Sequence, residues 1–195
     1  MVLSLVVILA VVGAVLLFAP QPGAVQQPQV GDDQAVAALD QAAEVLQAAP
    51  LLLVTGADSQ RLQPEDVPAA SDVLGAGEDW RLDYARTETT DDVPTWRVGV
   101  LSPRERRVDL EQAVAPSDEW LTRADAGAVG PPEPVEVAGL SWSRQVRGDG
   151  DTAYTFVQDG DGGDGQPSLT TVVTATSDSE DLRSVVALVS ASFTR

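Results

Sequence analysis

Apolar residues fill the amino-terminal stretch Val2–Ala19 without a single charge. As a helix, these eighteen residues would extend roughly 27 Å at about 1.5 Å each, close to the ~30 Å hydrocarbon core of a bilayer. Pro20 and Pro22 would end that helix, because proline lacks an amide hydrogen and disfavours helical geometry in the residue before it. The pattern therefore predicts a transmembrane anchor over residues 1–19.

Two other interpretations fit this stretch less well. A cleaved signal peptide needs a basic amino-terminal region and a small-residue cleavage site, but the first basic residue is Arg61. Cleavage after Ala19 would place Leu17 at the third position before the cut, and cleavage after Ala24 would place Pro22 there. The other interpretation is a helix buried in a soluble core, and an apolar surface all round at the very terminus disfavours it.

A change to polar, uncharged sequence follows the apolar run. Residues 20–31 are rich in Pro and Gln, which predicts an extended tether. Asp32 and Asp33 then offer an amino-terminal cap to a helix that continues to about Ala48, and Pro50 stops it. The apolar face of this predicted helix consists of Val36, Leu39, Ala43 and Leu46.

The pattern beyond Pro50 changes from helical spacing to that of strands. Leu51–Val54 predicts a short buried strand, and Thr55–Asp79 predicts a long loop with room for one short helical turn. From Trp80 on, apolar and polar residues alternate, as in half-buried strands. The in-phase apolar positions are Trp80, Leu82 and Tyr84, then Trp96, Val98 and Val100, then Val108, Leu110 and Val114. Pro103–Arg107 predicts the turn of a hairpin between the last two sets.

The next segments combine a short helix with further strands. Ser117 caps a predicted helix that carries Trp120, Leu121 and Ala124. The apolar positions change parity across Ala138-Gly139, which predicts either a tight turn or a bulge at this point. The strand residues on either side are Val135, Val137, Leu140 and Trp142, and later strands contain Tyr154, Phe156 and Leu169–Thr176.

The chain ends in a predicted helix. Ser177 and Glu180 form an S-x-x-E capping box, and one apolar stripe follows at Leu182, Val185, Val186, Val189 and Phe193. Strands joined by short turns, with helices at both ends, predict an α+β fold. We expect one domain over residues 32–195, in which an antiparallel sheet is packed by N- and C-terminal helices.

The composition narrows the chemistry that the chain can perform. All 12 basic residues are Arg, while Lys, His, Cys and Asn are absent, as is typical of a high-GC bacterial genome. The chain therefore lacks the residues for a Ser-His-Asp or Cys-His nucleophile pair, a thiolate and imidazole zinc site, or a phosphate-loop lysine. A formal charge of −18 disfavours phosphate backbones, so we expect no nucleic-acid partner. Carboxylate chemistry remains, and we expect no catalytic residue, metal or cofactor.

The acidic stretch Gly148–Gly165 matches no calcium-binding pattern. An EF-hand loop that starts at Asp159 would place Gly163 at its fifth position and Thr170 at its twelfth, where acidic ligands are needed. Flexible hairpin loops explain this stretch better. Asp151-Thr152-Ala153 resembles an aspartic-protease triplet only superficially, because that motif usually has Gly third.

Two groups of side chains are candidates for contact with a partner. The basic cluster of the sequence is Arg104, Arg106 and Arg107, which could bind an anionic partner or form a solvated turn. The tryptophans could line a carbohydrate or peptide groove, although their in-phase positions also suit a core; they are Trp80, Trp96, Trp120 and Trp142. The residues that we predict to contact a partner are Trp80, Arg97, Arg104, Arg106 and Arg107.

Short blocks along the chain resemble those of a known family. In order, they are Met1–Leu5, Thr95–Pro103, Val108–Ala113, Val137–Trp142, and Thr171–Thr176 followed by Asp181-Leu182. They resemble the successive blocks of the bacterial envelope family described as domain of unknown function 4245. The resemblance implies a single-pass membrane protein of high-GC Gram-positive bacteria, with no established activity and no functional residues to transfer. The chain departs from the family pattern between Thr55 and Asp79.

These observations lead to one expected function and one alternative. We expect a plasma-membrane protein that is held in the lipid bilayer by its amino-terminal helix, with residues 32–195 outside the cytoplasm. Its domain would be a non-enzymatic binding or interaction module for an envelope protein or a wall component. The alternative is a carboxylate-dependent hydrolase of wall glycans, which needs only two acidic side chains on facing walls of a cleft.

Overall fold

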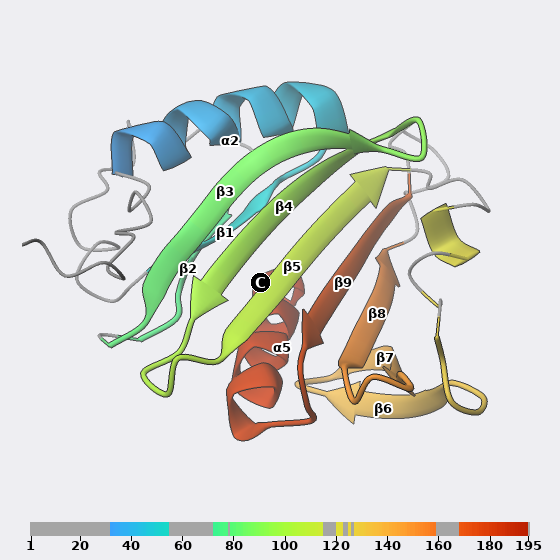
Figure 1. Ribbon diagram of the computed structural model, residues 1–195. Helices are drawn as coiled ribbons and strands as arrows, with labels where there is room; N and C mark the ends of the chain where they lie inside the picture. The colour runs from blue at the N-terminus through green and yellow to red at the C-terminus, as the bar shows by residue number, and fades with distance from the viewer. Residues whose placement is uncertain are drawn as a thin grey trace, which may run out of the picture.

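The computed structural model describes residues 32–54, 72–77, 79–114, 120–122, 125, 127–158 and 168–194. The predicted anchor and tether, residues 1–31, lie outside these ranges. Within them, no helix is both long and apolar enough to span a bilayer. A seven-stranded antiparallel sheet forms the body of the domain, and an N-terminal and a C-terminal helix pack against it (Figure 1). This architecture confirms the predicted α+β fold.

The strands of the large sheet run in the order β3-β4-β5-β9-β8-β7-β6, and all neighbours pair antiparallel. The last strand of the chain therefore lies at the centre of the sheet, between β5 and β8. The bounds are β3 (Arg81–Thr90), β4 (Val93–Leu101), β5 (Arg107–Val114), β6 (Glu133–Val137), β7 (Leu140–Val146), β8 (Thr152–Gln158) and β9 (Leu169–Ala175).

One face of this sheet is covered by helices, and the described residues cover the other only where Trp120 packs in a small buried cluster with Val93, Ala113, Ala153 and Val172. Helix α2 (Asp32–Leu46) packs against β3 and β4, and helix α5 (Glu180–Phe193) packs against β5, β6 and β9. A small parallel sheet of β1 (Leu51–Val54) and β2 (Asp72–Gly75) lies with α5 behind the large sheet in Figure 1. We call the covered side the inner face and the opposite side, turned toward the viewer in Figure 1, the outer face.

Alternation along the strands places a continuous apolar core on the inner face. Val98, Leu110, Val173 and Tyr154 are paired in one row across β4, β5, β9 and β8, and all four are buried. The predicted stripe of α5 packs onto this core through Leu182, Val185, Val186 and Val189, which are fully buried. Trp96 and Trp142 belong to this core, and Trp120 belongs to the small cluster on the outer face. All three are fully buried, whereas Trp80 is half-buried. Burial on this scale favours the core interpretation of these three tryptophans over a ligand groove.

The helix boundaries differ in detail from the sequence prediction. Helix α2 ends at Leu46, before the predicted Ala48, and its buried face uses Ala42 instead of Ala43. Ala42 lies three residues after Leu39 and four before Leu46, so it completes the same helical face. The cap of α5 is Ser179, whose hydroxyl accepts a hydrogen bond from the Leu182 amide at 3.2 Å. The predicted Ser177 cap is therefore wrong by two positions.

Two strand predictions were wrong for different reasons. Strand β2 lies inside the segment predicted as a loop, Thr55–Asp79. The prediction was wrong because a four-residue strand that begins with Asp72 and ends with Gly75 shows no alternation. Strand β3 continues to Thr90, and a register shift between Leu82 and Tyr84 interrupts its pairing with β4. Tyr84 consequently pairs with Gly99 and lies on the outer face, not beside Leu82 as the uninterrupted pattern predicted.

The predicted hairpins are confirmed. Strands β4 and β5 are joined through Pro103–Arg107, and β6 and β7 through Ala138-Gly139. Ala138 and Gly139 have φ angles of 48° and 84°, as a tight turn between twisted antiparallel strands requires. Of the predicted helix capped at Ser117, the structure describes only residues 120–122 as helical, and the proposed cap lies outside the described residues.

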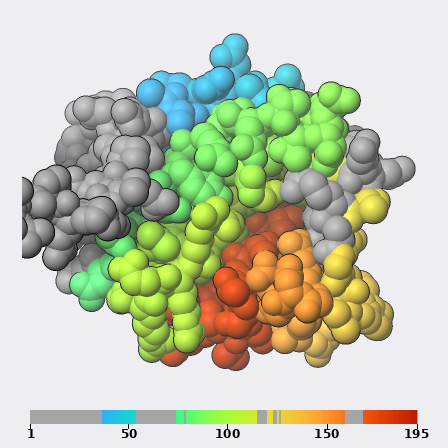
Figure 2. Space-filling model, in the orientation of Figure 1, coloured from blue at the N-terminus to red at the C-terminus, as the bar shows by residue number. Residues whose placement is uncertain are grey.

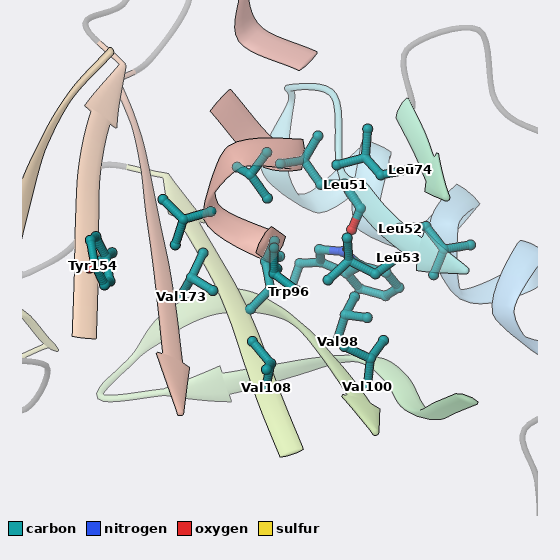
Figure 3. Packing of buried hydrophobic residues seen from close by; sticks show 14 of the residues in the cluster. Leu51, Leu52, Leu53, Leu74, Trp96, Val98, Val100, Val108, Tyr154 and Val173 are labelled. Atoms are coloured by element: carbon teal, nitrogen blue, oxygen red, sulfur yellow. The ribbon is translucent and has the colours of Figure 1, made fainter. Parts of the chain in front are cut away.

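Polar side chains attach the small sheet to the core. The Trp96 indole N–H donates to the Leu51 carbonyl at 2.8 Å, and the Leu51 amide donates to Gln112 Oε1 at 2.7 Å. Leu51 and Trp96 lie in the buried hydrophobic cluster (Figure 3), and Gln112 is buried as well. Two side chains of the large sheet thus satisfy both backbone polar groups of Leu51, which would otherwise lose water without replacement.

We predict that Trp96→Phe lowers the free energy of unfolding by about 1–3 kcal/mol, because the buried Leu51 carbonyl loses its donor. Urea denaturation measures this loss. Trp80→Phe is the control, since the Trp80 indole makes no hydrogen bond with another described residue, and it should cost clearly less. Equal losses in the two variants would show that aromatic volume, and not the hydrogen bond, accounts for the effect.

Candidate functional site

The outer face carries polar side chains at the centre of the sheet, where two rows of paired residues meet. Arg97 pairs with Glu111, and Glu111 with Val172 on the neighbouring strand. In the next row Gly99 pairs with Asp109, and Asp109 with Thr174. Because these positions alternate with core residues, the same strands that build the core bring these polar groups together.

A cavity of about 200 Å³ opens on this part of the outer face. Strands β4, β5 and β9 form its floor, and the turn between β7 and β8 contributes one wall. Figure 2 shows this face, with β5, β9 and β8 meeting near the centre of the view. The lining residues are Arg97, Asp109, Glu111, Arg147, Asp151, Val172 and Thr174.

Arg97 is held between two carboxylates. Its Nη1 lies 2.6 Å from Glu88 Oε1 and its Nη2 lies 2.7 Å from Glu111 Oε1. Burial disfavours the charge of Arg97, but the hydrogen bond to Glu88 and the charge of Glu111 outweigh burial and raise its pKa. Burial likewise opposes ionisation of Glu88, and Arg97 outweighs it and lowers the pKa of that carboxyl. Both ends of the Arg97 fork are therefore occupied by protein.

Tyr84 lies over Gly99 at the edge of the cavity and connects it to the β4–β5 hairpin. Its hydroxyl donates to Asp109 Oδ1 at 2.6 Å, and Arg107 Nε donates to the same oxygen at 2.8 Å. The Arg86 and Arg107 guanidinium carbons lie 4.6 and 5.1 Å from the ring centroid. Burial, followed by the hydrogen bond to Asp109, raises the pKa of Tyr84 to about 12. The phenol is thus a neutral donor that fixes one cavity carboxylate.

The turn between β7 and β8 fixes the backbone of Asp151. The Arg147 amide donates to the Asp151 carbonyl at 2.8 Å, and the Asp151 amide donates to Asp149 Oδ1 at 3.0 Å. Gly150 has a φ of 94°, which a residue with a side chain rarely adopts. The Asp151 carboxylate itself makes no hydrogen bond or ion pair with another described residue.

The five predicted contact residues do not form one site. Arg97 lines the cavity. Arg107 does not line it but contacts the Asp109 carboxylate and the Tyr84 ring at its edge. Arg104 lies 3.7 Å from Asp181 at the start of α5, on the inner side of the sheet. Arg106 is exposed on the hairpin, and Trp80 packs against the core cluster. The sequence cluster of arginines is therefore divided between the two faces.

Several residues of the site were missed from the sequence: Tyr84, Glu88, Asp109, Glu111, Arg147, Asp151 and Thr174. A signal existed for two of them, because Asp109 and Glu111 flank the core residue Leu110 and so must lie on the outer face. The others are brought to the cavity by strand order, which the local pattern does not contain. Among the described residues, no group of three or more potential ligands is arranged to hold a metal ion.

The fold and the site define an α+β domain with an open sheet face that carries an ion-pair network and a small polar cavity. The chain belongs to the family described as "Protein of unknown function (DUF4245)", whose model matches residues 1–189. The match confirms the resemblance that the short sequence blocks indicated. Neither the curated proteins nor the solved structures include a match to the chain.

Gly99 should be required for the position of Tyr84. A Cβ atom at this position would overlap the Tyr84 ring, so we predict that Gly99→Ala lowers the free energy of unfolding by about 1–3 kcal/mol. Urea denaturation of Gly99→Ala, Tyr84→Ala and the double variant forms the test. The added methyl group should cost much less in the Tyr84→Ala background, and an unchanged cost would contradict the contact.

Tyr84 should make stability depend on alkaline pH. The pKa of Tyr84 is about 12 in the folded chain against 10.0 ordinarily. Its contribution to the free energy of unfolding is therefore complete below pH ~10 and is lost as pH rises toward ~12. We predict that the urea midpoint of the native chain falls more steeply over this range than that of Tyr84→Phe. The chain has two tyrosines, so phenolate absorbance of Tyr154→Phe reports Tyr84 alone. A Tyr84 titration at its ordinary pKa would contradict this prediction.

Proposed function

We propose that this chain is a membrane-anchored binding module of the cell envelope. Residues 1–19 form a single transmembrane helix, residues 20–31 a tether, and residues 32–195 a domain outside the cytoplasm. The domain presents the outer face of its sheet to an envelope protein or wall component. The observation that carries this proposal is the polar cavity, which lies on the sheet face that the helices leave open.

The organisation of the outer face supports binding over a merely solvated surface. The Arg97 side chain is only 23% exposed and has a carboxylate on each side. The Tyr84 hydroxyl and the Arg107 guanidinium hold Asp109 in the same way. Side chains that are fixed before a partner arrives lose little conformational freedom on binding, which favours affinity. Of the predicted contact residues, Arg97 and Arg107 belong to this surface.

Three predicted contact residues lie outside both the cavity and the ion-pair network that fixes Asp109. A partner that extends beyond the outer face would meet Arg104 and Arg106, which are exposed at the β4–β5 hairpin. Trp80 is half-buried, so only its accessible edge is available to such a partner. Only a partner that extends around the β4–β5 hairpin toward the inner face would contact all three, and contacts there add less to affinity than at a desolvated centre.

The amino-terminal sequence supports the anchor. The apolar run Val2–Ala19 is long enough to cross a bilayer, and it lies within the part of the chain that the family model matches. The first described helix begins at Asp32, directly after the proposed tether. A domain that starts where the tether ends is consistent with a folded module held at a distance from the membrane.

The cavity also bears on the alternative function, a carboxylate-dependent hydrolase of wall glycans. Asp109, Glu111 and Asp151 line one cavity, and glycoside hydrolysis requires two carboxyl groups with free oxygens. However, Tyr84 and Arg107 both occupy an oxygen of Asp109, and Arg97 occupies one of Glu111. Two of the three carboxylates therefore already serve as internal acceptors, and binding is the function that the geometry supports better.

Intact cells provide the test of topology and binding together. We predict that external protease removes the domain and that a reporter fused after Arg195 is active only outside the cytoplasm. A photo-crosslinking residue at Asp149, exposed in the turn that carries Asp151, should yield a discrete product. The same residue at Asp40, exposed on α2, is the matched control and should yield none.

Protection from protease, or a reporter active only in the cytoplasm, would overturn the proposed topology. Equal crosslinking from Asp149 and Asp40 would overturn the binding role of the outer face. If the purified full chain instead released reducing ends from wall glycan, and Asp151→Asn abolished that release, the hydrolase would replace the binding module.

A further inference from the structure

The size of the outer-face cavity limits what it can hold. Its volume of about 200 Å³ equals that of roughly six or seven water molecules, because liquid water occupies about 30 Å³ per molecule. Pockets for drug-sized ligands begin near 300 Å³. The cavity therefore accommodates one small molecule or the end of one side chain, and not a sugar chain or a folded segment.

The charges of the lining favour a cation over an anion. Three carboxylates and two guanidinium groups line the cavity. The two terminal nitrogens of Arg97 are bound to Glu88 and Glu111, and its Nε is buried without a hydrogen-bond partner. Each terminal nitrogen of Arg97 thus uses one N–H on a carboxylate, and the two negative charges beside Arg97 outweigh its own positive charge, so it offers an anionic ligand no uncompensated charge. Arg147 also has an interaction of its own within the chain.

The acceptors that remain for a ligand lie close to the turn between β7 and β8. The Asp151 carboxylate makes no hydrogen bond or ion pair with another described residue, although hydrogen bonds to Arg147 and Asp149 hold its backbone. The Thr174 hydroxyl likewise makes no hydrogen bond within the described part of the chain and lines the same cavity. One fixed carboxylate and one hydroxyl are acceptors that suit a compact donor with several N–H groups.

We propose that this cavity binds the primary ammonium group of a lysine-like amine, with Asp151 as the counter-charge and Thr174 as a second acceptor. An ammonium group is a compact charge with three donors, whereas a guanidinium is a planar fork that needs a wider, bidentate partner. The charge of −18 on the chain draws cations toward the molecule. The inference deepens the proposed binding function and rests on it, because it assigns the chemistry of the bound group.

Calorimetric titration of the full-length chain in detergent tests the assignment. The probes are Nα-acetyl-lysine amide, its uncharged analogue Nα-acetyl-norleucine amide, Nα-acetyl-arginine amide and acetate. We expect saturable binding of the lysine probe that weakens with added salt, weaker binding of the arginine probe, and no binding of the other two. Equal binding of the norleucine probe, or preferential binding of acetate, would overturn the proposal.

Two variants identify the residues that bind the ammonium group. Asp151→Asn should weaken binding of the lysine probe by about tenfold or more, since it removes the charge but keeps an acceptor. Thr174→Val, which keeps the shape of the side chain, should weaken binding severalfold. Glu136→Gln removes an exposed charge on β6 and should leave affinity unchanged. Unchanged affinity in folded Asp151→Asn and Thr174→Val would overturn the site, as would an equal loss in Glu136→Gln.

A further pair of probes distinguishes a partner protein from a small metabolite as the source of the amine. A lysine-containing peptide that binds more tightly than a free diamine would indicate a partner protein, and the reverse order would indicate a small metabolite. This assignment can fail independently of the proposed function. If Asp149 crosslinks in cells but the purified chain binds no amine, the proposed binding function stands and the ammonium site is excluded.

Discussion

Alternation along β5 joins the core of this domain to its polar cavity. Leu110 packs into the inner core, while its neighbours Asp109 and Glu111 line the cavity on the outer face. β4 repeats the arrangement with Val98 between Arg97 and Gly99. Because side chains alternate with a period of two, a one-residue slip in either strand would place carboxylates in the core and apolar residues in the cavity. The register that builds the core therefore also builds the site.

Charge compensation explains why the outer face can keep so many ions close together. Glu88 and Glu111 flank Arg97, and Arg107 lies against Asp109. Exposed ion pairs contribute little to stability, but loss of one member of a partly buried pair leaves the other charge desolvated and unpaired. The network is thus better understood as a device that fixes positions than as a source of stability. Asp151, which has no such partner among the described residues, differs from the other cavity carboxylates in this respect.

The sequence predicts those parts of the fold that depend on local pattern. The hairpin at Ala138-Gly139 and the apolar stripe of α5 follow from turn chemistry and helical spacing, and both are observed. The position of Tyr84 does not follow, because a register shift in β3 reverses its face. The parallel strand β2 depends on pairing with β1 across a long segment, and its four residues carry no period of their own. Long-range pairing decided each of these cases.

Strand order explains why sequence reasoning recognised so little of the site. Arg97 was predicted as a contact residue, but the cavity also needs the β7–β8 turn and β9, which follow much later in the chain. These elements meet only because β9 inserts between β5 and β8, so that Thr174 pairs with both Asp109 and Ala153. No continuous segment contains the cavity, because its lining residues come from the β4–β5 hairpin, the β7–β8 turn and β9. The site is therefore a property of the completed sheet, and the long-range contacts that create it are those that fold most slowly.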